Sequence, residues 1–280
     1  MLRLCCWPVL AFAVFGAVFP AQAAPQLMLL LENHLPQSDA DRINVETLIL
    51  QRLSQSAAPE LQIQPVQLST LRAWQMLKQP GNYCALSKIK TKDREKLLYF
   101  ARLPTTIYPP LQLIGTRTFG KTPLDLARLV QQKPELKIGV ISGRSYGAEL
   151  DKLISSHPKQ FFQRSGAEAA QNLALMLSKG RLDALLEFSA ITMRSLQHLP
   201  EAPKLYPHQL TGQPLVSGYL ACNKSELGLQ MVQWIDQKMA DAAYQTDVLQ
   251  LHRQFFSPDD FALLQPELLK VFPQAMPQTD

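Results

Sequence analysis

The sequence predicts an α/β fold in which strands alternate with helices and most neighbouring strands are parallel. Apolar runs of strand length, bounded by Pro, Gly and polar turns, alternate with segments of helical periodicity along the chain. No internal repeat of fixed period occurs, and no low-complexity linker divides the chain. The two halves are therefore expected to be joined by strands rather than by a flexible tether.

The first half begins with a buried strand, QLMLLLE (26–32). A helix follows, capped by Ser38 or Asp39. Its apolar positions recur at helical spacing, at Ile43, Leu48, Ile49 and Leu53. The segment LQIQPVQL alternates apolar and polar residues, which predicts a strand in which Pro65 marks an edge or a bulge.

Ser69 caps the next predicted helix, STLRAWQMLK, which Pro80 and Gly81 bring to an end. Its apolar residues fall on one face, which places Trp74 in the core with Leu71 and Leu77. YCALS (83–87) is the next strand.

The second half repeats the alternation. PPLQLIGTR leaves a Pro-rich turn as a strand, and Thr122-Pro123 is expected to start a helix, because proline is tolerated at the first helical position. The later elements are the strand LKIGVI, the glycine-bearing loop SGRSYG, the helices AELDKLISS and SGAEAAQNLALMLSKG, the strands LDALLEF and SGYLACNK, a helix over 225–243 and a helical tail.

The first residues have the layout of a secretory signal peptide: Arg3, an apolar core over 10–19, and the A-x-A site at 21–23. We expect cleavage after Ala23 and a soluble periplasmic chain, the other possibility being an uncleaved anchor. The net charge of +5 comes without long Lys/Arg blocks. It is weak evidence for a nucleic-acid or membrane partner and slightly favours a small anionic ligand.

Only Cys84 and Cys222 remain after such cleavage. In an oxidising compartment they form either one disulfide or two buried free thiols. A metal site is not expected, because the five histidines show no ligand spacing with either cysteine. No catalytic motif and no dinucleotide fingerprint occurs, which argues against an enzyme and predicts no cofactor.

Small polar loops follow the predicted strands, and ligands of open α/β sheets bind beyond the carboxyl ends of strands. These loops are ENHLP with Glu32, Ser69 to Arg72, Ser87 to Arg94, SGRSYG, and Glu187 to Ser189. Ser145 lies beside a predicted helix N-terminus, where free N–H groups attract a carboxylate or phosphate. An ordinary helix cap is the other interpretation of Ser145. Arg144 and Tyr146, in the same loop, are further candidates for contact with a ligand.

These segments, in this order, resemble the type II periplasmic solute-binding proteins of the amino-acid-binding family 3. The resemblance is carried by ALSKIKTKDREKLLYFA, LKIGVISGRSYGAEL, LMLSKGRLDALLE and SGYLACNKSELGLQMVQWIDQKM, and spans the mature chain. The C-A-L strand, K-T-x-x-R-E-K and G-R-S-Y-G together are similar to a proteobacterial subgroup of such proteins.

The resemblance implies two lobes joined by two hinge strands, with the ligand held between them. Lobe 1 would comprise residues 24–111 and 217–280, and lobe 2 residues 112–216. The strands that contain Cys84 and Cys222 would lie in the same lobe, so the resemblance also implies a disulfide between them. Closure about the hinge would bury the ligand.

The resemblance assigns the ligand carboxylate to Arg94, with help from Ser87 and Ser145. Arg94 would bind it through a planar fork. A second interpretation has Arg94 capping its own loop through a surface ion pair with Asp93 or a neighbouring residue. The ligand-ammonium Asp of the family falls on Phe188, which cannot neutralise a charge.

Other positions near the expected ligand also depart from the family pattern. Ile89 replaces a polar residue, and the only aromatic stackers are His34 and Trp74. Glu187 follows directly before Phe188 but is expected to point to the opposite face of its strand. Either Glu187 or Glu32 binds an ammonium instead, or the ligand lacks one.

The implied function is capture of a small, carboxylate-bearing solute by a monomer, for an ABC importer or a membrane sensor. An enzyme on the same scaffold, dehydratase-like, is the second hypothesis, with Glu32, His34 and Glu187 as candidate proton-transfer groups. A partner protein of a membrane receptor, whose cleft has lost ligand affinity, is the third.

Overall fold

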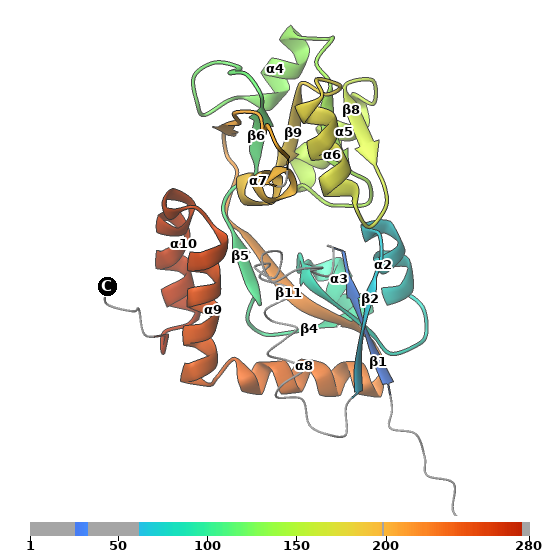
Figure 1. Ribbon diagram of the computed structural model, residues 1–280. Coiled ribbons are helices and arrows are strands. Elements are labelled where there is room, and N and C mark those ends of the chain that lie inside the picture. The colour runs from blue at the N-terminus through green and yellow to red at the C-terminus, as the bar shows by residue number, and fades with distance from the viewer. Residues whose placement is uncertain (1–25, 33–61, 198, 276–280) are drawn as a thin grey trace, which may run out of the picture.

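The computed structural model describes residues 26–32, 62–197 and 199–275. The predicted signal peptide, His34 and the helix expected over 38–53 lie outside these described residues. Two sheets account for the strands, one in the lower and one in the upper part of Figure 1. We call the part of the molecule built on each sheet lobe 1 and lobe 2.

The lobe 1 sheet has the strand order β2-β1-β3-β11-β4, and β5 also pairs with β11. β1 is parallel to β2 and β3, whereas β11 is antiparallel to β3, β4 and β5. Its strands are β1 (Gln26–Leu31), β2 (Gln62–Gln67), β3 (Tyr83–Lys88), β4 (Leu98–Phe100), β5 (Thr106–Tyr108) and β11 (Val216–Asn223). Its helices are α2 (Thr70–Leu77), α3 (Lys92–Leu97), α8 (Glu226–Lys238), α9 (Ala242–Phe255) and α10 (Pro258–Val271).

The lobe 2 sheet has the order β10-β6-β9-β7-β8. β7 is parallel to β8 and β9, and β6 is antiparallel to β9 and β10. Its strands are β6 (Gln112–Gly115), β7 (Ile138–Ile141), β8 (Phe161–Arg164), β9 (Ala184–Glu187) and β10 (Tyr206–Gln209). Its helices are α4 (Leu126–Gln132), α5 (Ala148–Ser156), α6 (Ala169–Ser178) and α7 (Ser189–Leu196).

The α/β class is confirmed, but the sheets are mixed rather than mostly parallel. The chain crosses between the sheets over 109–111 and returns over 210–215. The strands that follow these crossings, β6 and β11, run antiparallel to their neighbours, which makes both sheets mixed. The division at residues 111/112 and 216/217 stays a prediction.

One predicted helix start is wrong. Helix α4 begins at Leu126, and its cap is Asp125, whose carboxylate accepts the N–H of Arg128 at 3.0 Å. Thr122-Pro123 is instead a cis peptide bond in the preceding turn. An aspartate cap satisfies a free N–H group of the first turn, which a proline cannot do.

The cysteine pair forms the disulfide that the family resemblance implied. Cys84 on β3 and Cys222 on β11 lie at paired register positions in the lobe 1 sheet, and both are fully buried. The bond closes a loop with a sequence separation of 138 residues, which contains all of the lobe 2 sheet.

The buried side chain of His252 connects helix α9 to strand β5, which lies before the crossing to lobe 2. His252 is fully buried, and its Nε2 accepts the N–H of Ile107 on β5 at 3.0 Å. Its Nδ1 lies 2.7 Å from the carbonyl oxygen of Val248 and donates to it in the neutral tautomer. Because a protonated ring could not accept from Ile107, this arrangement requires neutral His252.

We expect His252 to make the protein sensitive to acid. Burial lowers its pKa from 6.5 to about 4, although the hydrogen bond with Val248 opposes the shift. The unfolded chain therefore binds this proton at a higher pH than the folded chain, so stability is full above pH 6.5 and falls towards pH 4. The loss at pH 4 is roughly 3 kcal/mol in free energy of unfolding.

Urea unfolding at pH 7 and pH 4 measures this loss. His252→Gln should show a smaller difference between the two pH values than the wild type, whatever its stability at pH 7. His157→Gln, at the C-terminal end of α5, should keep the wild-type difference. An unaltered pH dependence in His252→Gln would contradict the assignment.

Candidate functional site

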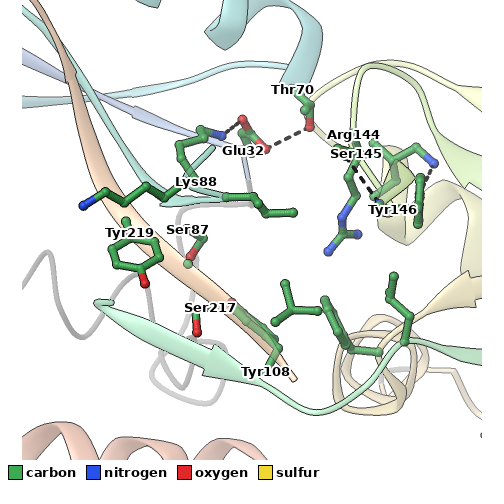
Figure 2. Close-up of a pocket in the computed structure, with 18 of the residues that line it drawn as sticks. Glu32, Thr70, Ser87, Lys88, Tyr108, Arg144, Ser145, Tyr146, Ser217 and Tyr219 are labelled. Carbon is green, nitrogen blue, oxygen red and sulfur yellow. Dashed lines mark hydrogen bonds and ion pairs between the residues drawn. The ribbon is translucent and has the colours of Figure 1, made fainter. Parts of the chain in front are cut away.

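A cavity of about 730 Å³ lies between the two lobes. It is lined where β1, β3, β7 and β9 end, by residues that include Glu32, Lys88, Ile141 and Glu187. The starts of α2 and α5 also reach it, through Thr70 and Gly147. Figure 2 shows side chains from both lobes around this space. A site beyond the carboxyl ends of strands is where α/β sheets bind ligands.

Arg94 lines this cavity from helix α3. Thr91 caps that helix by accepting the Arg94 backbone N–H at 3.3 Å, which leaves the Arg94 side chain directed away from the cap. Its guanidinium carbon lies 4.2 Å from the centre of the Trp74 ring, and Nη1 donates to the carbonyl oxygen of Ile89 at 2.8 Å. The remaining N–H groups have no partner among the described residues.

The ion pair with Asp93, considered above for Arg94, is not formed. Asp93 binds Lys96 instead, at 2.7 Å. Burial lowers the pKa of Arg94, while the charges of Asp151 and Glu32 raise it. Since arginine stays protonated in proteins, the cavity contains a half-buried cation that has no ion pair with a described carboxylate.

Trp74 packs against the core cluster that contains Ala73 and Leu77, as its helical face predicted, and it also lines the cavity. The buried face of α2 consists of Thr70, Ala73 and Leu77, and Trp74 lies at its edge, partly buried. Besides Arg94, the ring faces Lys88, whose Nζ lies 5.5 Å from its centre. An aromatic face attracts cations in this way.

Ser87 lines the cavity at the end of β3 with a left-handed backbone, φ 53°. Its hydroxyl lies 3.2 Å from that of Thr106. The backbone of Gly218 packs against it so closely that a Cβ at 218 would lie 2.7 Å from Ser87 Cα. Such conformations cost energy in non-glycine residues, and they occur preferentially at ligand sites.

Glu32 follows β1 and lines the cavity, but its carboxylate is fully engaged. One oxygen pairs with Nζ of Lys88, which is 4% exposed, and the other accepts the hydroxyl of Thr70 at 3.0 Å. Figure 2 shows this three-residue group on one side of the cavity. Neither Lys88 nor Thr70 was predicted from the sequence to line the site. The charged side chain at the end of the strand YCALSK was the signal that could have indicated Lys88.

Glu187 also faces the cavity, which corrects the expectation that it points to the opposite face of its strand. It is the last residue of β9, where the regular alternation ends. One oxygen accepts from Arg144 Nη1 at 2.6 Å and the other from the backbone N–H of Phe188 at 2.9 Å. Burial lowers the pKa of Arg144, but Glu187, Tyr146 and Tyr108 together raise it by more, so the net shift is upward.

Ser145 and Tyr146 line the cavity and are linked to helix α5. The Ser145 hydroxyl donates to Asp151 at 2.7 Å, and the Tyr146 N–H donates to the same carboxylate at 2.7 Å. The helix cap is Gly147, so Ser145 is not the cap. The Tyr146 hydroxyl accepts the N–H of Ile141, and burial raises its pKa.

Ser69 does not line the cavity. Its hydroxyl accepts the N–H of Arg72 and caps α2, as the sequence predicted, and the next residue, Thr70, reaches the cavity instead. The other candidates, Arg94, Ser87, Ser145, Arg144, Tyr146, Glu32 and Glu187, are brought together around one space. Their binding of a ligand stays a prediction.

The described residues contain neither a candidate metal site nor a candidate membrane-spanning helix. No group of three or more His, Cys, Asp or Glu side chains in this part of the chain could hold a metal ion. No helix within the described ranges is long and apolar enough to cross a membrane.

The two lobes, their mixed sheets and the cavity between them define the fold of type II periplasmic binding proteins, as comparison with solved structures shows. A putative L-cystine ABC transporter protein from Listeria monocytogenes is 15% identical, with a TM-score of 0.59 over 84% of this chain and 98% of its own. An ancestral arginine-binding protein bound to arginine is 12% identical, with a TM-score of 0.61 over 83% and 98%.

A third solved structure, an arginine transport system periplasmic binding protein from Legionella pneumophila, is 18% identical, with a TM-score of 0.54 over 83% of this chain and all of its own. These three structures are of binding or transport proteins rather than enzymes. No family model and no curated protein matches the sequence. At these identities the likeness establishes the fold, and the predicted proteobacterial subgroup stays a prediction.

Proposed function

We propose that this protein is a periplasmic solute-binding protein that encloses a small carboxylate-bearing solute between lobe 1 (residues 24–111 and 217–280) and lobe 2 (residues 112–216). The observation that carries the proposal is Arg94: a half-buried guanidinium, stacked on Trp74, that lines the cavity between the lobes and has N–H groups without a described partner. Arginine presents a planar fork that matches a carboxylate.

The fold supports delivery to an ABC importer, the kind of system named for the Listeria structure. The enzyme hypothesis has less support, because Glu32 and Glu187 are both paired with cations. His34 lies outside the described residues.

Thermal unfolding of the purified protein with a panel of amino acids, polyamines, organic acids and short peptides tests the proposal. A carboxylate-bearing solute should raise the melting temperature, because a ligand at 100 times its Kd stabilises the folded state by about 2.7 kcal/mol. Polyamines, which carry no carboxylate, should have no effect. A panel that shifts nothing would favour the degenerate-cleft hypothesis, and turnover of a bound solute would favour the enzyme.

We expect the contact between the lobes at Gly143 to control affinity. Gly143, in the loop after β7, has φ +80°, and a Cβ there would lie 3.1 Å from Cα of Leu71 at the start of α2 in the other lobe. Gly143→Ala should therefore push the lobes apart and raise the Kd about 10-fold, or about 1.4 kcal/mol. Isothermal titration with the best solute of the panel measures this.

Gly180→Ala is the matched control for Gly143→Ala. Gly180 also has a left-handed backbone, φ +64°, but nothing lies within 4 Å of the added Cβ. Both variants carry the backbone strain, about 1–2 kcal/mol, and only Gly143→Ala adds the contact between lobes. Equal affinity of the two variants would contradict the role of Gly143 in closure.

A further inference from the structure

The charged side chains of the cavity are arranged to disfavour a second cation. The lining contains three acidic residues, Glu32, Glu95 and Glu187. Each is paired with a basic residue of the same lining: Glu32 with Lys88, Glu95 with Lys90 at 3.4 Å, and Glu187 with Arg144 at 2.6 Å. No lining carboxylate in the described part of the chain is left to receive an ammonium group.

The pairs Glu32–Lys88 and Glu187–Arg144 are more buried than the pair Glu95–Lys90. Glu187 is 6% exposed and Lys88 is 4% exposed, and both oxygens of Glu187 and of Glu32 already accept a hydrogen bond. An ammonium at either carboxylate would lie beside the positive charge of Arg144 or Lys88, which repels it, or would have to displace that cation. That displacement would leave a buried charge without its partner, which is costly.

The described lining carries an excess of positive charge. It contains five basic residues, Lys88, Lys90, Lys92, Arg94 and Arg144, against the three acidic ones. The two basic residues that form no ion pair with a described residue are Arg94 and the exposed Lys92. A cleft of this charge attracts an anion and repels an ammonium.

The wall across the cavity from Glu32 and Lys88 is apolar and aromatic. Tyr108 and Phe188 stack there with ring centres 4.7 Å apart, and Figure 2 shows Tyr108 on the side of the space opposite the Glu32 group. Further apolar lining comes from Leu111, Ile141, Ile191, Leu215 and Val216. A solute body placed against this wall gains by losing apolar contact with water.

We propose that the cavity selects a carboxylate that has an apolar body and no ammonium group. This rests on the proposed function and names its class of ligand. The carboxylate binds Arg94, the body packs against Tyr108 and Phe188, and Arg144 and Lys88 exclude an ammonium by occupying Glu187 and Glu32. Arg144 and Lys88 thereby determine specificity without having to touch the ligand.

Matched pairs of probes test the proposal by isothermal titration at pH 7.5 on the purified protein. 3-Phenylpropanoate and L-phenylalanine differ only by the ammonium group, as do 4-methylpentanoate and L-leucine. The ammonium-free member of each pair should bind at least about 10-fold more tightly, a difference of about 1.4 kcal/mol. Equal or tighter binding of the amino acids overturns this inference and leaves the proposed function standing. If no carboxylate of either kind binds, the proposed function falls as well.

Two variants assign the exclusion to its residues. Arg144→Gln frees Glu187 and should reduce the preference for 3-phenylpropanoate over L-phenylalanine at least about 3-fold, and Lys88→Gln should do the same through Glu32. Arg128→Gln, on the exposed face of α4 outside the cavity, removes the same charge and should keep the wild-type preference. Circular dichroism establishes which variants fold, and the wild-type comparison decides the ligand class if neither does. A folded variant with an unchanged preference removes that residue from the proposal.

Discussion

Replacing Arg94 with Ala is expected to weaken binding of a carboxylate solute at least about 100-fold, or about 2.7 kcal/mol. The guanidinium is the half-buried cation of the cavity that lacks an ion pair among the described residues, and it is held over Trp74 at 4.2 Å. Its removal takes away both the charge and the directed N–H groups. Isothermal titration with the tightest carboxylate of the solute panel measures the loss.

Two further variants make the Arg94 result specific. Arg94→Lys keeps the charge but not the planar fork, so its affinity should fall between those of the wild type and Arg94→Ala. Arg128→Ala removes an exposed arginine outside the cavity and should bind as the wild type does. The three should unfold with similar midpoints, since Arg94 forms no buried ion pair. Wild-type affinity in Arg94→Ala would refute the assignment of the carboxylate site.

Of the substitutions proposed, removal of the disulfide is expected to lower the free energy of unfolding the most. A loop of 138 residues closed by Cys84 and Cys222 restricts the unfolded chain by roughly 4–5 kcal/mol in the chain-entropy account. Alanine at both positions suits the fully buried, apolar surroundings. The free energy of unfolding of the Cys84→Ala/Cys222→Ala double variant, from urea denaturation, should be lower by about that amount.

A reductant provides the control for the disulfide. Wild-type protein unfolded and refolded in dithiothreitol loses the same cross-link, so its stability should approach that of the double variant. The double variant itself should not respond to dithiothreitol. Equal urea midpoints for wild type and double variant without reductant would show that the bond contributes nothing to stability.

The bond also bears on how the lobes unfold. The chain leaves lobe 1 after β5 and returns as β11, and the disulfide joins β3, before the departure, to β11, after it. The disulfide therefore keeps strands β3 and β11 of lobe 1 linked when lobe 2 unfolds. The covalent link lies entirely within lobe 1, so it places no direct covalent constraint on the angle between the lobes.

The residues around Phe188 lie at the cavity and also beside the segments that cross between the lobes. The family resemblance placed Phe188 at the position of a ligand-binding carboxylate, and the structure places its ring against Tyr108 on β5, beside Phe256 of the C-terminal helices. Ser189, the next residue, donates to Asp260 of α10 at 3.0 Å. The segment after β9 thus connects the ligand cavity to the elements that flank the crossing between lobes.

Structural features that depend on residues close together in the chain, such as strands, helices and helix caps, could be predicted from the sequence. Apolar alternation and helical spacing indicated β1, β3, β7, β9 and most of the helices, and Ser69 capped α2 as its position predicted. The resemblance, carried by local runs, indicated the two-lobed fold and the Cys84–Cys222 bond. Such signals lie within a few residues, because caps and periodicity act over one or two turns.

The pairing of charged side chains around the cavity depends on the tertiary structure. Glu32 and Lys88 are 56 residues apart, and Arg144 and Glu187 are 43 apart. No local pattern specifies such a pair, since it depends on how the sheets bring the ends of β1, β3, β7 and β9 together. The sequence left open whether Glu32 or Glu187 could receive an ammonium. The fold gives both carboxylates an internal cation, because a buried charge requires a partner.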